Sequence, residues 1–493
     1  MKIRSRAHKQ SANTRSADVH PVRLLAQQVD LRLAEAAIPS RSRHAPLAAA
    51  DPLLSFVPKI VTIETELLIP TNYARTHTKR QIRQIARSIE RFGFTNPILI
   101  DDNRQILAGH GRLEAARLLG LRTVPTLALT HLDAAEKRAY VIADNRLAEL
   151  AGWDPEILAI ELQELVDLGF DVELTGFEMA EVDLILEEAG ESLDENAPRD
   201  LTPPYVDTSC VSQPGDLWHL GNHCLLCGDA RNPFTYETLL NGLKAAFVFT
   251  DPPYNVPIDG HVCGGGRVRH RDFAMGCGEM DEPEFTAFLE VVFRQLVMHT
   301  LPGSIHDICM DWRHMPEMLA AGRAVYTELK NLCVWNKSNG GLGTFYRSKH
   351  ELVFVWKNGK FPHINNFELG QFGRYRSNVW DYAGTGAGNQ KRSEELALHP
   401  TVKPVALIAD AIKDCSQRGD IVLDPFAGSG TVFIAAERMG RKAYAIEIDP
   451  HYVDVAVRRW QNYTGRQAIH ARSGLPFEDV ETAQAAHPQR IKE

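Results

Sequence analysis

The stretch that decides the fold runs from Ile421 to Thr431 and reads Ile-Val-Leu-Asp-Pro-Phe-Ala-Gly-Ser-Gly-Thr. It opens with a short apolar run, as expected of a strand buried on both faces of a parallel sheet. Two glycines then permit a sharp turn and close backbone approach, and a helix is expected from Thr431 to Met439. A second apolar run follows over 443–446. This strand–helix–strand order predicts a doubly wound α/β domain with a mostly parallel sheet.

An acidic residue follows each strand of this unit. Asp424 ends the first strand, and Glu447 lies at the end of the next, 23 residues further along. An acid about 20 residues beyond a glycine loop commonly binds a ribose hydroxyl. The loop lacks the full Gly-x-Gly-x-x-Gly pattern, and the sequence contains no Gly-x-x-x-x-Gly-Lys-Ser/Thr. A nucleoside without a pyrophosphate therefore fits better than NAD.

A second motif, Asp251-Pro252-Pro253-Tyr254, comes directly after the apolar run 246–249. Consecutive prolines stiffen the backbone, so a carboxylate, carbonyl oxygens and an aromatic ring are held near the carboxyl end of a strand. In an open parallel sheet this edge is where ligands bind. The alternative is a rigid turn whose tyrosine packs against the sheet.

The two motifs together resemble the S-adenosylmethionine-dependent DNA amino-methyltransferases, and their order resembles the β class of that family. The segments 225–229 and 399–404, Leu-Leu-Cys-Gly-Asp and His-Pro-Thr-Val-Lys-Pro, extend the resemblance. It implies a Rossmann-like methyltransferase fold. It also implies transfer of a methyl group from S-adenosylmethionine to an exocyclic amino group of a base flipped out of double-stranded DNA, as in restriction-modification.

The resemblance further implies the site residues. The Asp251 carboxylate and the Pro252 carbonyl would accept hydrogen bonds from the target amine, and Tyr254 would face the base; Pro253 completes the catalytic motif. The expected cofactor-binding residues are Asp229, Thr401, Lys403, Asp424, Phe426, Gly428, Gly430 and Glu447. Asp before Pro-Pro-Tyr resembles the adenine-specific members, so adenine N6 is the expected target and cytosine N4 the alternative.

Basic residues interleaved with aromatic ones follow the catalytic motif, a composition that suits phosphate neutralisation and stacking. The expected DNA-contacting residues are Arg267, Arg269, Arg271, Arg347, Lys349, Arg374 and Arg376. The alternative is a solvated insertion. Trp335, Phe354 and Trp356 are instead expected in the core. Cys224 and Cys227 lack a second ligand pair at zinc spacing, so no metal is expected.

A smaller α+β domain is predicted over residues 59–150. Gly109-His110-Gly111-Arg112, followed by a helix, resembles the ParB-like partition fold, whose glycine–arginine box binds nucleotide phosphates at a helix N-terminus. His110 departs from the acidic residue common in partition proteins, which puts nucleotide hydrolysis in doubt. A role in holding or nicking DNA and a simple tight turn before a helix are the alternatives.

Charge separates the remaining segments. Residues 1–50 carry nine Lys and Arg against three Asp and Glu, whereas residues 154–200 carry sixteen Asp and Glu against one Arg. The expected organisation is a disordered basic tail (1–58), the ParB-like domain (59–150), an acidic segment of two amphipathic helices with a linker (151–205), the methyltransferase domain (206–475) and a tail (476–493).

The composition indicates a globular chain, with 44% hydrophobic and 24% charged residues and without an apolar stretch long enough to span a membrane. Eight cysteines in 493 residues do not suggest a disulfide framework, so a cytoplasmic location is expected. A homodimer is a further expectation. The rival to the enzyme is a ParB-like DNA- or nucleotide-binding protein with a degenerate methyltransferase body; a third alternative is methylation of RNA or protein amines.

Overall fold

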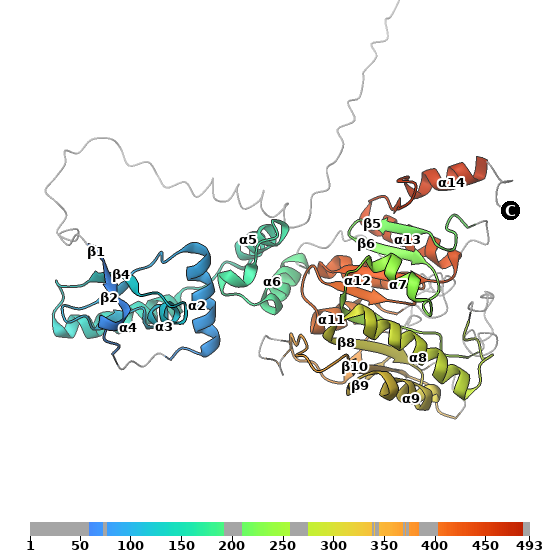
Figure 1. Cartoon of the computed structure of the whole chain (residues 1–493), viewed down its shortest axis with the longest axis horizontal. Coiled ribbons are helices and arrows are strands. Elements are labelled where there is room, and N and C mark those ends of the chain that lie inside the picture. The colour runs from blue at the N-terminus through green and yellow to red at the C-terminus, as the bar shows by residue number, and fades with distance from the viewer. Residues whose placement is uncertain are drawn as a thin grey trace, which may run out of the picture. The chain divides into compact units, whose positions relative to one another are not determined.

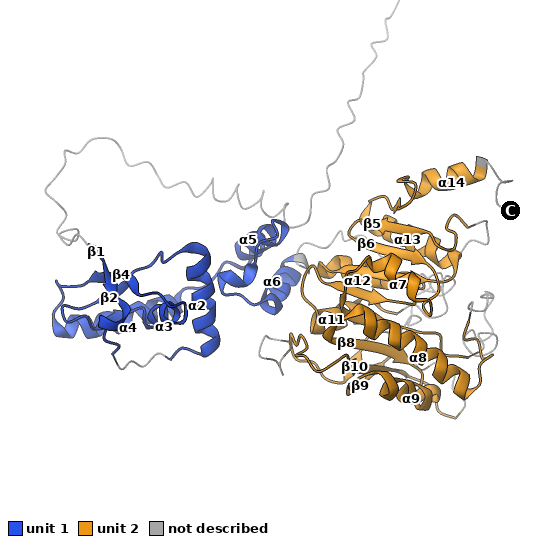
Figure 2. Ribbon diagram, in the orientation of Figure 1, with its two compact units in different colours: residues 1–195 blue, residues 196–493 orange. Residues whose placement is uncertain are grey.

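The computed structural model describes residues 59–71, 76–191, 210–256, 275–337, 340, 345–367, 370, 374–383 and 403–486. The predicted basic tail lies outside them. The chain divides into two compact units, residues 1–195 and 196–493 (Figure 2). Among the described residues, none of the helices has the length and apolar character that crossing a membrane requires.

The N-terminal unit contains a four-stranded sheet in the order β1-β4-β2-β3. Figure 1 labels β1, β2 and β4 of this sheet. Its strands are β1 (Ile60–Glu64), β2 (Ile98–Ile100), β3 (Ile106–Ala108) and β4 (Thr123–Ala128). Its first helices are η2 (Thr65–Leu67), α2 (Lys79–Phe92), α3 (His110–Leu118) and α4 (Ala134–Leu150). Helix α2 starts where the Thr78 side chain accepts a hydrogen bond from the Gln81 amide. Buried Ile98, Ile106 and Leu113 form the core, as their spacing predicts.

The acidic segment also belongs to this unit and is more ordered than a linker. It forms α5 (Pro155–Asp167), η3 (Val172–Thr175) and α6 (Met179–Glu191) around a small core that contains Leu162 and Val182. Arg87 on α2 pairs with Asp171 and Glu173. Two exposed acids of this segment therefore form ion pairs with the sheet domain at the surface.

The second unit is built on a ten-stranded sheet in the order β11-β9-β10-β8-β7-β12-β13-β6-β5-β14. The strands are β5 (Leu217–Leu220), β6 (His223–Cys227), β7 (Ala245–Thr250), β8 (Thr300–Met310), β9 (Glu328–Asn336), β10 (His350–Lys357), β11 (Val379–Asp381), β12 (Ile421–Asp424), β13 (Lys442–Glu447) and β14 (Ile469–His470). The central strands from β8 to β6 are parallel. The doubly wound fold is thus confirmed.

Helices cover both faces of this sheet because its central strands are apolar on both sides. The helices are α7 (Pro233–Leu240), α8 (Glu282–His299), η5 (Trp312–His314), α9 (Met315–Val325), α11 (Val405–Cys415), α12 (Thr431–Met439), α13 (Pro450–Thr464) and α14 (Phe477–Ala486). On β7, Phe247 and Phe249 join one core with α11 and α12, whereas Val248 joins the other with α8. The predicted tail from 476 is in part helical, and Phe477 packs 5.1 Å from Trp218.

Candidate active site

Three acidic residues meet at one edge of the large sheet. Strands β7, β12 and β13 are adjacent and parallel, so their carboxyl ends lie side by side. Asp251 follows β7, Asp424 ends β12 and Glu447 ends β13. The two motifs are about 170 residues apart in sequence, yet they line one cavity of about 150 Å³. The lining includes Asp251, Pro252, Pro253, Tyr254, Lys403, Asp424, Phe426, Gly428 and Glu447.

The glycine loop is held in its turn by contacts on both sides. The Gly428 amide donates to a Glu447 carboxylate oxygen at 2.8 Å. Gly430 has φ +76°, and a Cβ there would stand 2.7 Å from the Cβ of Ala456, so only glycine fits. Buried Arg459 on α13 donates from Nη1 to Ser429 Oγ at 3.0 Å and Thr431 Oγ1 at 2.9 Å. The loop is therefore a preformed concave surface.

Burial dominates the ionisation of the two acids beside this loop. It raises the pKa of Asp424 to about 7, against hydrogen bonds from the Phe426 amide and the Thr250 hydroxyl. Burial likewise raises the pKa of Glu447 to about 7, although the Gly428 and Asp449 amides favour its charged form. Both groups sit ready to accept hydrogen bonds from a ligand's hydroxyl groups.

The Asp-Pro-Pro-Tyr motif lies in a cluster of charged side chains. Lys403 Nζ donates to Asp251 Oδ2 and lies 3.0 Å from Glu351 Oε2 on β10. The Tyr254 hydroxyl donates to Asp251 Oδ1 and lies 3.3 Å from Glu351 Oε2. Lys337, just after β9, pairs with the other Glu351 oxygen. Asp251 is therefore a carboxylate at the cavity wall whose orientation is set by two neighbours.

Burial and the neighbouring lysines shift the pKa values of the two carboxyl groups in this cluster in opposite directions. Burial raises the pKa of Asp251, and Lys403 lowers it only partly. For Glu351, burial is outweighed by Lys403 and Lys337, which lower its pKa to about 2. Burial disfavours the Lys403 ammonium, but Asp251 and Glu351 outweigh it and raise the pKa of Lys403. The tyrosine stays protonated because burial and the Asp251 charge raise the pKa of Tyr254.

Two of the expected cofactor residues in the described part of the chain, Asp229 and Gly430, do not line the cavity. The neighbours of Asp229, Gly228 and Ala230, do line it, and the Asp229 carboxylate pairs with Arg231 at 2.7 Å. Thr401 lies outside the described residues. In the described part of the chain, no group of three or more His, Cys, Asp or Glu side chains could hold a metal ion.

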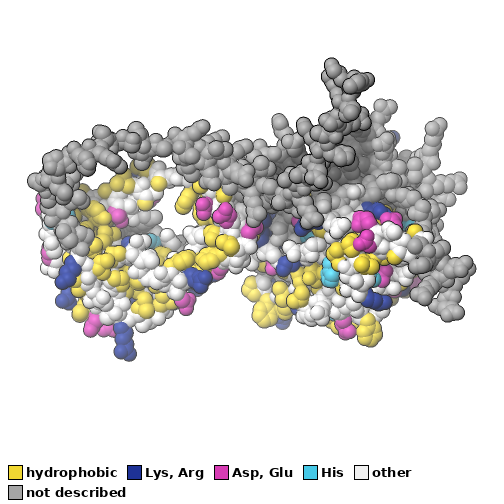
Figure 3. Space-filling model, turned by 90° about the horizontal axis from the view of Figure 1, so that it is seen from above, with side chains coloured by type: hydrophobic (Ala, Val, Ile, Leu, Met, Phe, Trp, Pro, Cys, Tyr) yellow, Lys and Arg dark blue, Asp and Glu magenta, His cyan; other side chains and the backbone are white. Residues whose placement is uncertain are grey.

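The expected DNA-contacting residues divide into two kinds. Arg347 and Lys349 are exposed next to Phe345 and Tyr346, whose side chains are 87% and 81% exposed. Arg267, Arg269 and Arg271 lie outside the described residues. On the visible face in Figure 3, positive and negative side chains are scattered rather than gathered into one charged patch.

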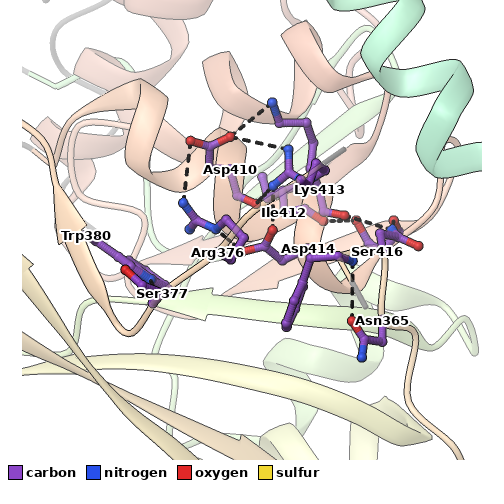
Figure 4. Close-up of polar contacts among 12 residues, drawn as sticks. Asn365, Arg376, Ser377, Trp380, Asp410, Ile412, Lys413, Asp414 and Ser416 are labelled. Carbon is purple, nitrogen blue, oxygen red and sulfur yellow. Dashed lines mark hydrogen bonds and ion pairs between the residues drawn. The ribbon is translucent and has the colours of Figure 1, made fainter. Parts of the chain in front are cut away.

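Arg374 and Arg376 correct the sequence-based expectation. Both pair with buried Asp414 on α11, Arg376 at 2.8 Å, and Arg376 also donates to the Tyr382 hydroxyl. Figure 4 shows Arg376 with Asp410 and Asp414 in this cluster. Their guanidinium groups are committed to fastening the segment before β11 to α11, so they are not available to DNA phosphates. Trp335, Phe354 and Trp356 are buried, as expected.

The glycine–arginine box of the N-terminal unit lies at the start of α3. Gly109 is the N-cap with φ +101°, and a Cβ there would stand 3.1 Å from Arg112 Nε. Arg112 donates to the Asn96 carbonyl at 2.9 Å, and burial lowers its pKa against the opposing effect of Asp144. His110 Nε2 lies 3.3 Å from the Thr71 hydroxyl. The turn therefore presents a helix N-terminus with a cation beside it.

Sequence reasoning missed Glu351, Lys337 and Arg459. Glu351 has one local signal, an acid directly before the apolar run 352–356 of strand β10. Lys337 and Arg459 have none, because a single basic residue near a strand end or on a helix is common at protein surfaces. Only the contacts described above distinguish them.

A parallel sheet with two polar loops around one cavity at its carboxyl edge defines a Rossmann-like methyltransferase fold. The comparisons make this specific. A DNA methylase family model matches residues 245–458, a ParB N-terminal domain model matches 55–145, and a ParB-methyltransferase HTH domain model matches 156–214. The acidic helical segment thus belongs to a domain type that its composition did not suggest.

Relatives agree with this division. The chain is 28% identical over 236 residues to Type II methyltransferase M2.LlaDCHI of Lactococcus lactis subsp. cremoris, covering 43% of this chain and 80% of that protein. It is 43% identical over 81 residues to the ParB-like nuclease domain-containing protein YnaK of Escherichia coli, covering 16% and 93%. A crystal structure of TTHA0409, a putative DNA modification methylase from Thermus thermophilus, matches at 22% identity and TM-score 0.35, covering 52% and 96%. The chain therefore carries a ParB-like N-terminal domain followed by a DNA methylase domain.

Proposed function

We propose that this methyltransferase transfers a methyl group from S-adenosylmethionine to the N6 amino group of adenine in double-stranded DNA. The observation that supports it most strongly is the shared cavity, which is lined by Asp251 and Tyr254 together with Gly428 of the glycine loop and Glu447. The adenine preference rests on Asp251 at the head of the Pro-Pro-Tyr motif.

The cavity suits the proposed cofactor. When bound, S-adenosylmethionine supplies an electrophilic methyl group on a sulfonium sulfur. Glu447 can accept hydrogen bonds from ribose hydroxyls, and the glycine loop admits close approach of a ligand. The apolar wall of Phe249, Ile408 and Val432 excludes water from the rest. Lys403 was expected near the methionine portion; its pairing with Asp251 gives it a role in the catalytic cluster as well.

The chain's own groups favour transfer at the amine. Hydrogen bonds from the amino group to the Asp251 carboxylate and the Pro252 carbonyl favour a pyramidal nitrogen that develops positive charge. Tyr254, held by its hydroxyl bond to Asp251, offers a ring to the base. The raised pKa of Asp251 also suits it to take the proton that the methylated nitrogen must lose.

One experiment tests this proposal. The full chain is expressed in a methylation-free host, and the modified bases of the host DNA are mapped for the wild type and Asp251→Ala. N6-methyladenine that disappears in the variant is expected. If N4-methylcytosine is found instead, the target is cytosine rather than adenine. If the DNA from the wild-type host is unmodified, the result favours a degenerate methyltransferase domain or an RNA or protein substrate.

We also propose that the ParB-like domain binds a nucleotide phosphate at the start of α3. The proposal is supported by the free amide groups expected at a helix N-terminus and by Arg112 beside them. A role in holding DNA is the alternative, and titration of the full chain with nucleoside triphosphates and with DNA separates the two.

A further inference from the structure

Glu351 is a largely buried carboxylate in the catalytic cluster that neither motif contains. Its side chain is 14% exposed. One oxygen faces Lys403 Nζ at 3.0 Å and the Tyr254 hydroxyl at 3.3 Å, while the other pairs with Lys337. Because Lys403 also donates to Asp251, the four groups form a chain of alternating charge, from Lys337 through Glu351 and Lys403 to Asp251.

The strands fix this chain in place. Glu351 on β10 is paired across the ladder with Trp335 on β9, so both side chains lie on the same face. Lys337 lies two residues beyond Trp335 and bonds through its amide to the Lys349 carbonyl at 2.8 Å. The buried Trp335 ring lies 4.6 Å from Lys337 Nζ and 5.8 Å from Lys403 Nζ. The two ammonium groups are therefore held over one aromatic surface.

The charge on Asp251 depends on how Lys403 is shared. The groups that face Asp251 are Lys403, Glu351, Tyr254, Cys309 and Asp424. Within this set Lys403 is the cation, and it pairs with two carboxylates, those of Asp251 and Glu351. In a poorly solvated cluster, an ion is stable only where its partner is available. Lys337 pairs with Glu351, so Glu351 competes less strongly for Lys403, and Lys403 remains paired with Asp251.

We propose that Glu351 and Lys337 are positioning residues that tune the proton affinity of Asp251 by dividing Lys403 between two carboxylates. This inference rests on the proposed role of Asp251 as acceptor of the target amine. In that reaction the nitrogen lone pair forms the N–C bond, the S–C bond breaks with its electrons going to sulfur, and the nitrogen then loses a proton to Asp251. A carboxylate paired too tightly accepts that proton poorly, and one left unpaired is protonated beforehand.

Two substitutions should move the proton affinity of Asp251 in opposite directions. Glu351→Gln removes the carboxylate that competes for Lys403, so Lys403 pairs with Asp251 alone. The acid limb, which is the fall of the methyl-transfer rate at low pH, then moves to lower pH. Lys337→Met leaves Glu351 to draw Lys403 away, so the limb moves to higher pH. We expect each shift to be about one pH unit.

The experiment measures single-turnover methyl transfer by the full chain as a function of pH. The matched controls are Glu328→Gln and Lys330→Met, because these two residues of β9 form an exposed pair at 3.1 Å and should leave the limb unchanged. Lys337→Arg should restore the wild-type profile. Thermal melting checks that each variant folds. If Glu351→Gln does not fold, the pH shift of Lys337→Met and its reversal in Lys337→Arg still test the inference.

A limb that stays at the wild-type pH in the folded variants, or that moves in the same direction in both, would overturn the inference. That failure is distinct from failure of the proposed function. If the wild type methylates no DNA, or if Asp251→Ala keeps its activity, the proposed function itself is wrong. An active, Asp251-dependent enzyme with an unmoved limb rejects only the tuning by Glu351 and Lys337.

Discussion

The two units each place a glycine-rich turn before a helix, yet they surround it with opposite charge. In the N-terminal unit, Gly109 precedes α3 beside the Arg112 guanidinium. In the second unit, Gly430 precedes α12 and the Gly428 amide points at the Glu447 carboxylate. The same local turn therefore suits different chemistry: a cation beside a helix N-terminus suits an anionic phosphate, whereas a carboxylate beside the glycine loop suits ribose hydroxyls.

The largest effect is expected where the carboxylates of the second unit touch the reacting group. Asp251→Ala should lower the rate of methyl transfer by about 100-fold to 1,000-fold, because it removes an acceptor that acts on the developing charge. Binding of S-adenosylmethionine should stay near the wild-type level, as isothermal titration calorimetry can check. Retained turnover would show that the acidic character of this site is not what drives the reaction.

The glycine loop itself can be broken sterically. Gly430→Ala forces a side chain into a left-handed turn and against Ala456, so it should destabilise the second unit by about 2–4 kcal/mol. The control is Gly465→Ala, where φ is +70° and a Cβ would have no atom of the described residues within 4 Å. That variant should cost only about 1 kcal/mol. Equal losses in thermal melting would contradict the close approach at Gly430.

Ionisation of Glu447 should make the stability of the unliganded protein depend on pH. Burial raises its pKa from 4.5 to about 7 in the folded state, so the folded protein holds a proton that the unfolded chain releases. Stability should therefore fall as the pH rises from 4.5 to 7 and then level off. Glu447→Gln should reduce that fall by about 1–3 kcal/mol, measured by denaturation at pH 5 and pH 8. An unchanged pH dependence would show that Glu447 is not buried as an acid.

The smallest effect is expected at the basic turn. Arg112→Ala should weaken nucleotide binding by the full chain about tenfold, as expected for loss of one charge-assisted contact at a partly exposed site. Arg117→Ala removes a cation from the same helix, paired with Glu114 at 3.1 Å on the surface, and should change little. If the two variants weaken nucleotide binding equally, Arg112 contributes only general positive charge and not a specific contact at the turn.

Regular elements were largely predictable. The helix expected over 431–439 is α12, and the apolar runs at 246–249, 421–423 and 443–446 lie within β7, β12 and β13. These elements are set by apolar periodicity and turn glycines, which are local properties. The acidic helices α5 and α6 were also expected, but their packing as part of the N-terminal unit was not. That packing depends on residues such as Arg87, whose partners lie more than eighty positions away.

The sequence by itself determined the two motifs, the strands that carry them and therefore the class of chemistry, because turn chemistry and strand burial are encoded within a few residues. Only the tertiary structure decided which charges serve the site. Arg374 and Arg376 look like Arg347 and Lys349 in sequence, but the first two are buried against Asp414 and the others are exposed. Glu351 and Lys403 lie 100 and 152 residues beyond Asp251 in the chain, yet Lys403 contacts both carboxylates. Whether a charged side chain is solvated or paired depends on distant segments, and no local pattern records it.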